Sequence, residues 1–125
     1  MSSELERECE RSPKVTADFQ YGAASKSRDD MPNNWKVTLH YQGRSMTADF
    51  YGGSMVENPS TADVLYSLLV DTSAGDQSFS DFCGDFGYDE DSRSAEATWK
   101  ACKATAPRLH RLLGADFGRF SYLEH

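Results

Sequence analysis

A chain of 125 residues with 38% hydrophobic residues and no low-complexity tract can bury one core, which excludes global disorder. Its formal net charge of −7 makes direct DNA binding unexpected, because nucleic acid is bound by basic faces. Three cysteines form no CxxC motif, and no apolar run approaches the ~20 residues of a membrane span, so we expect a reducing, cytoplasmic setting without membrane contact.

The two ends of the chain are expected to lie outside the folded domain. Residues 1–13 are densely charged and predict a leader that is either frayed or a short amphipathic helix. Residues 14–122 form the predicted single domain. Residues 123–125, Leu-Glu-His, resemble the start of an expression tag.

Alternation of apolar and polar residues predicts three strands in the N-terminal half. The first covers 15–21 and is followed by a loop at 22–34 that is rich in turn residues. The next two, 35–41 and 45–51, are joined at Gln42-Gly43, where glycine supplies the positive φ of a tight turn. A three-stranded antiparallel sheet is therefore expected.

Capping residues predict two helices after the sheet. Ser60 followed by Asp63 is typical of a capping box, and the helix that begins there should end at 73–75. Ser78 begins a second, short helix in the same way, and Gly87 is expected to end it.

A third helix is predicted from Asp91 or Ser92 to Gly114. Pro107 falls inside it, and a kink is favoured over a break because the apolar spacing keeps its phase across the proline. The apolar positions, four and three residues apart, are Ala95, Trp99, Cys102, Ala106, Leu109 and Leu113. Three aromatic residues that follow are expected to fold back on the core: Phe117, Phe120 and Tyr122.

Strands come first and helices second, which predicts an α+β fold. We expect a three-stranded antiparallel sheet from the N-terminal half, packed against about three helices from the C-terminal half.

The C-terminal half is electrically bipolar. Six acids against Arg93 give residues 81–96 a local charge of −5. The predicted partner-binding residues are the carboxylates of this stretch and one aromatic residue, namely Asp81, Asp85, Tyr88, Asp89, Glu90 and Asp91. The following helix carries +4, a rival basic patch made of Lys100, Lys103, Arg108 and Arg111. The simpler interpretation of the acids is that they solvate a turn and favour the N-terminal end of the third helix.

No catalytic motif is present, so we expect neither an enzyme nor a cofactor. The carboxylates lack the alternate spacing of a calcium loop, although a metal-dependent activity stays open as a third hypothesis. Cys102 and His110 are separated by ~12 Å on an intact helix, which is too far for a nucleophile and its base. Cys83 is expected to be a buried small hydrophobe, and His40 to lie on the polar face of a strand.

Five stretches of the chain resemble small proteins encoded by tailed phages and prophages. The distinctive string is Gly-Tyr-Asp-Glu-Asp-Ser-Arg-Ser-Ala-Glu at 87–96, and the resemblance covers roughly residues 35–113. The other stretches are Trp35-Lys36-Val37-Thr38-Leu39, Gly43-Arg44-Ser45-Met46, Pro59 through Leu65, and Phe79-Ser80-Asp81-Phe82-Cys83. That family has no established catalytic residues, so none is carried over.

The resemblance implies a mobile-element accessory protein that acts in the cytoplasm of a host bacterium. A small acidic domain without a catalytic motif is similar to anti-CRISPR inhibitors, which implies a host partner that is a Cas effector or nuclease. Binding would block the recognition or cleavage of DNA by that effector or nuclease. The alternative is a non-enzymatic phage accessory protein that forms a homodimer or binds another host protein.

Overall fold

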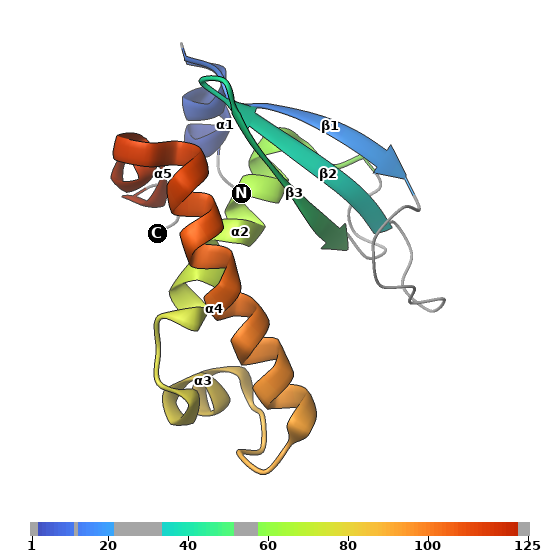
Figure 1. Ribbon diagram of the computed structural model, residues 1–125, viewed down its shortest axis with the longest axis vertical. Coiled ribbons are helices and arrows are strands. Elements are labelled where there is room, and N and C mark those ends of the chain that lie inside the picture. Colours follow the sequence, from blue (N-terminus) through green and yellow to red (C-terminus); the bar gives the residue numbers. More distant parts are fainter. Residues whose placement is uncertain (1–2, 12, 22–33, 52–57, 123–125) are drawn as a thin grey trace.

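The computed structural model describes residues 3–11, 13–21, 34–51 and 58–122 (Figure 1). The loop predicted at 22–34 lies outside these ranges apart from Asn34, and so does the tail at 123–125.

The predicted sheet is confirmed. Strands β1 (Thr16–Tyr21), β2 (Asn34–Tyr41) and β3 (Arg44–Tyr51) pair antiparallel in the order β1-β2-β3. The β2–β3 turn consists of Gln42 and Gly43, which have φ values of 49° and 78°. Two successive residues at positive φ give the turn a twist that matches that of the strands.

The helices confirm the α+β class. They are α1 (Ser3–Glu10), α2 (Thr61–Gly75), α3 (Phe79–Phe86), α4 (Arg93–Leu113) and α5 (Phe117–Tyr122), with a 3-10 turn, η2 (Gly114–Asp116), between the last two. The predicted caps are in place: Ser60 and Asp63 form a reciprocal capping box at α2. Gly87 ends α3 in the left-handed conformation.

Residues 3–10 fold as the amphipathic helix that was one of the two expectations for the N-terminus. Leu5 and Cys9 are buried in the main core, and Glu8 is buried beside them. The helix therefore contributes a face to the core.

Helix α4 continues through Pro107 without a break, and Gly114 follows it as the C-cap. Four of the six predicted apolar positions are buried, whereas Trp99 and Ala106 are half-buried; Thr105 and Leu112 are buried as well. Phe120 is fully buried as expected, but Tyr122 is 78% exposed, so the prediction that it folds back is wrong. The reason is that 117–122 forms its own helix and turns only one face to the core.

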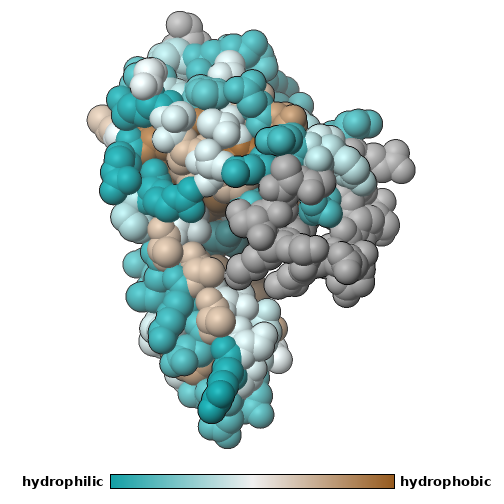
Figure 2. All heavy atoms as spheres, turned by 45° about the vertical axis from the view of Figure 1, so that its right-hand side comes forward, coloured by the Kyte–Doolittle hydropathy of each residue, from teal (hydrophilic) through white to brown (hydrophobic). Residues whose placement is uncertain are grey.

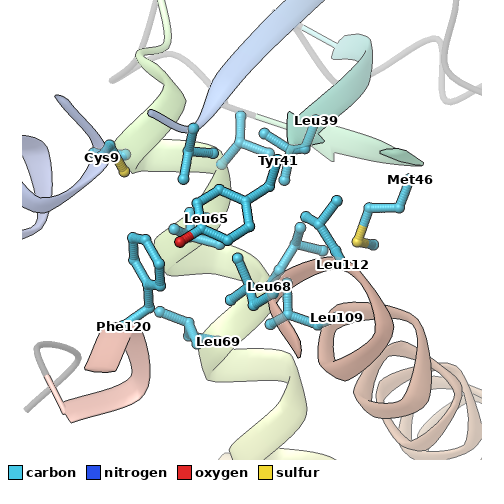
Figure 3. Close-up of a cluster of buried hydrophobic side chains, with 14 of the residues drawn as sticks. Cys9, Leu39, Tyr41, Met46, Leu65, Leu68, Leu69, Leu109, Leu112 and Phe120 are labelled. Carbon is cyan, nitrogen blue, oxygen red and sulfur yellow. The ribbon is translucent and has the colours of Figure 1, made fainter. Parts of the chain in front are cut away.

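The main core lies between one face of the sheet and the helices α1, α2, α4 and α5. Figure 3 shows side chains from these elements converging around Tyr41, whose ring meets Phe120 edge-on at 5.7 Å. The opposite face of the sheet carries polar contacts, such as the 3.1 Å hydrogen bond between the Thr38 and Thr47 hydroxyls. One covered and one polar face is the usual arrangement of an antiparallel sheet.

A buried polar network ties α1 to the C-terminal segment. The Glu8 carboxylate is 8% exposed and forms ion pairs with Arg11 at 3.0 Å and with Arg119 at 2.5 Å. Arg119 also donates to the Tyr41 hydroxyl, which donates to Asp116 at 2.6 Å. A charge as buried as that of Glu8 requires such partners.

Helix α4 extends beyond the main core and carries a second, smaller one. Its buried members are Ala74, Phe82, Cys83, Ala95 and Cys102, with Phe79 and Trp99 packed against them. Helices α2 and α4 meet at Gly75, where an added Cβ would lie 2.5 Å from the Lys103 main-chain nitrogen. Close main-chain contact at this glycine fixes how α4 leaves the body of the molecule (Figure 1).

Candidate docking surfaces

The acidic stretch lies at the far end of the molecule from the sheet. Helix α3, the turn that follows it and the first turns of α4 form a projecting lobe at the bottom of Figure 1. In the view of Figure 2 this end is covered mostly by hydrophilic residues. We call the side chains of the predicted site in this lobe the acidic tip: Asp81, Asp85, Tyr88, Asp89, Glu90 and Asp91.

Local hydrogen bonds build the turn that carries the tip. The main-chain N–H of Tyr88 donates to the Cys83 carbonyl at 2.9 Å as the chain leaves α3. The Asp89 carboxylate accepts from the Asp91 N–H at 3.1 Å, and its carbonyl accepts from the Ser92 N–H at 2.9 Å. Ser92 then caps α4 by accepting from Ala95. The turn is thus held at both ends by helix caps.

The five carboxylates of the tip are all exposed. Asp85 is hydrogen bonded by the Gln77 side chain, and Asp89 accepts within the turn. Within the described ranges, none of the five forms an ion pair. Formation of the turn therefore uses one oxygen of Asp89, and the carboxylates as a group keep their negative charges exposed to solvent.

Two exposed aromatic rings stand among these carboxylates. Phe86 is 49% and Tyr88 40% exposed, and both rings pack on buried Phe82, with centroids 4.9 Å and 5.5 Å away. Tyr88 was among the predicted residues, whereas Phe86 was missed. Helix α3 ends at Phe86, and the ring of this last helical residue is exposed.

The rival basic patch is not one surface. Lys100 pairs with Glu96 at 3.8 Å, and Lys103 lies 4.7 Å over the Trp99 ring and donates to the Gly75 carbonyl. Arg108 and Arg111 lie further along α4, toward the sheet. The two lysines therefore contact residues of the lobe, Glu96 and Trp99, whereas the two arginines lie at the junction of α4 with β3.

At that junction, two arginines bind main-chain carbonyls across the interface. Arg108 of α4 donates to the Thr47 carbonyl, and Arg44 of β3 donates to the Leu112 carbonyl at 2.8 Å. Arg111 has no partner among the described residues. Arg44 was not part of the predicted patch, because it lies far from α4 in the sequence and reaches that helix only through the packing of β3 against it.

The three cysteines lie in the two cores, Cys9 in the main core and Cys83 and Cys102 in the second. Cys83 is buried as predicted, and burial raises the pKa of Cys9 to about 12 and that of Cys102 to about 11, which keeps these thiols protonated. His40 lies 2.8 Å from Asp18 on the polar sheet face, as expected. His110 stacks on Phe117 with the ring centroids 3.7 Å apart.

Two cavities adjoin α2. One of about 390 Å³ lies between α2, α4 and α5 and is lined by His110 and Phe117 among others. The second, about 320 Å³, is lined by Phe50, Tyr66 and Asp71 among others, and burial raises the pKa of Asp71 to about 6. Across 3–11, 13–21, 34–51 and 58–122, no three His, Cys, Asp or Glu side chains are grouped as metal ligands.

Comparisons with protein-family models, curated proteins and solved structures gave no match. Among the helices of the described ranges, none combines the length and the apolar character needed to cross a membrane.

Proposed function

We propose that the protein is a phage or mobile-element inhibitor of host defence that binds a Cas effector or nuclease through the acidic tip. The observation that carries the proposal is a projecting lobe with two exposed aromatic rings and five exposed carboxylates, none of which forms an ion pair with another described residue. The resemblance of residues 87–96 to phage-encoded proteins supplies the class of partner.

Electrostatics explains why such a tip suits such a partner. Proteins that hold nucleic acid do so in basic clefts, and a negative ridge is steered toward them and takes the place of phosphates. The rings of Phe86 and Tyr88 would add the apolar contact that charges alone do not give, since aromatic residues are enriched where proteins meet. Inhibition would then be stoichiometric and would need no catalytic group.

Phage plating on a bacterium with active CRISPR immunity tests the proposal. Expression of the native chain is expected to restore plaque formation. A tip variant with four neutral substitutions is expected to fail: Asp85→Asn, Asp89→Asn, Glu90→Gln and Asp91→Asn. Asparagine at position 89 retains the oxygen that accepts from Asp91, so the turn is preserved.

A matched control carries the same change of charge away from the lobe, namely Glu4→Gln, Glu6→Gln, Glu10→Gln and Asp18→Asn. Full activity of this control together with loss in the tip variant supports the tip as the docking surface. Full activity of the tip variant would exclude it, and loss of activity in Arg111→Glu alone would assign docking to the basic junction instead.

The alternative function is self-assembly into a homodimer. The apolar positions of α4 that could have formed a helical interface, such as Leu109 and Leu113, are buried inside the chain. This leaves the polar face of the sheet, with Thr38 and His40, as the surface for a second copy. Light scattering distinguishes the two functions, because a strict monomer contradicts the alternative.

A further inference from the structure

A pocket of about 240 Å³ lies where the C-terminal part of α4 meets the start of β3. It is lined by Arg44, Ser45, Met46, Arg108, Arg111 and Leu112. Among the described residues that line it there is no aspartate or glutamate. Three arginine side chains therefore contribute to the wall of one small cavity, and no acidic residue is among the described residues of that wall.

Two of the three guanidinium groups are held in place before any ligand binds. The Arg44 Nε donates to the Leu112 carbonyl at 2.8 Å and an Nη donates to Gln42 at 3.1 Å, while Arg108 is held by the Thr47 carbonyl. These bonds use two of the five donors of Arg44 and one of the five donors of Arg108, so each guanidinium group keeps further N–H groups for a ligand. Fixing the donors in advance lowers the entropy cost of binding.

Arg111 is the third arginine of the pocket. No residue in the described part of the chain accepts a hydrogen bond from it, so none of them occupies its five donors. Arg44 is also close to Gly114, where an added Cβ would lie 3.2 Å from an Nη, so the glycine leaves the room in which that guanidinium sits. The cluster is thus composed of two anchored arginines and one, Arg111, that is not held by any residue of 3–11, 13–21, 34–51 or 58–122.

We propose that this pocket binds a phosphate group. A single carboxylate is matched by one arginine fork, whereas a phosphate offers three oxygens and a charge of about −1.5 to −2, which suits three guanidinium groups. The cavity is smaller than the roughly 300 Å³ at which sites for whole small molecules begin. The ligand is therefore an isolated phosphate or the phosphate of a larger molecule that extends into solvent.

The acidic tip does not cancel this local positive charge. Helix α4 has 21 residues and is therefore about 30 Å long, and the tip and the arginines lie at its opposite ends. That separation is about three Debye lengths at an ionic strength of 0.1 M, so the two fields are largely independent. The proposal is also independent of the function proposed for the tip.

Titration of the ¹⁵N-labelled protein followed by NMR tests the proposal, with inorganic phosphate as the first probe. We expect saturable shifts at Ser45 and Leu112 and at the arginine Nε–H signals. Arg111→Gln should weaken binding by about tenfold or more, as expected for the loss of a charged hydrogen-bond donor. Arg93→Gln, an exposed arginine at the other end of α4, is the matched control and should bind as the native protein does.

A short RNA with a 5′-phosphate and the same RNA with a 5′-hydroxyl identify the source of the phosphate. Stronger binding of the first supports a terminal phosphate, and equal binding of both supports a phosphodiester, provided that Arg111→Gln weakens each. Absence of saturable shifts with all three probes would overturn the proposal. Equal binding by Arg111→Gln and the native protein would overturn it as well.

Discussion

Substitution of Gly75 by alanine tests the contact that joins α2 to α4. An added Cβ would lie 2.5 Å from the Lys103 nitrogen, 2.6 Å from the Cys102 carbonyl carbon and 2.7 Å from the Lys103 Cα. All three atoms belong to the main chain of α4, so no change of rotamer can remove the overlap. The helices must move apart, and the packing of the lobe moves with them.

The loss of stability caused by this movement can be estimated from the effects of overpacking in protein interiors. Extra methyl groups in a packed interior cost about 1–3 kcal/mol, and the main-chain position of the overlap at Gly75 places it at the upper end, about 3 kcal/mol. In a domain of this size that corresponds to a fall in Tm of roughly 10 °C or more.

Gly84→Ala is the matched control, because Gly84 also lies in a helix but nothing is found within 4 Å of its added Cβ. Alanine there should leave the protein unchanged or raise the free energy of unfolding by about 0.5–1 kcal/mol, through helix propensity. Thermal unfolding followed by circular dichroism measures both. Equal Tm values for the two variants would refute the close contact between α2 and α4.

Two further predictions concern buried charges. Asp71→Asn should raise the free energy of unfolding by about 1–2 kcal/mol at pH 8, since burial raises the pKa of Asp71 to about 6 and disfavours its charged form. The gain should shrink as the pH falls below 6 and vanish below about 4, where the carboxyl is protonated in both the folded and the unfolded chain. Denaturant titrations at several pH values measure it, and a gain that does not change with pH would show that the charge of Asp71 is not its cause. Arg119→Gln should cost about 2–3 kcal/mol in the same assay because it leaves buried Glu8 with one partner, whereas Lys100→Gln, which breaks the exposed pair with Glu96, should cost at most about 0.5 kcal/mol. Similar losses for both would show that the Glu8 network adds no stability beyond that of a surface pair.

Local signals explain why the fold could be predicted from the sequence. Alternation around Val37 and Leu39, the glycine of the β-turn and the serine caps each depend on a few neighbouring residues, and all were confirmed. Pro107 could also be placed within one helix, because the apolar spacing on both sides has the same phase. Such features do not depend on which element packs against which.

Features that join distant segments could not be predicted. Arg44 reaches the α4 arginines only because β3 lies beside the end of that helix, and Glu8 meets Arg119 only because α1 packs beside α5. The exposure of Phe86 depends on where α3 ends, and that of Tyr122 on the turn before α5. Composition identified the charged stretches, but their division into an acidic tip and an arginine junction requires the tertiary structure.

The central claim, docking through the acidic tip, is tested most directly by the rate of association with a purified Cas effector. Surface plasmon resonance should show that the native protein associates faster at low salt than at high salt, since its carboxylates steer the encounter. The tip variant should associate at least about tenfold more slowly at low salt and lose most of this salt dependence. Association of the tip variant at the native rate, with the native salt dependence, would contradict the claim.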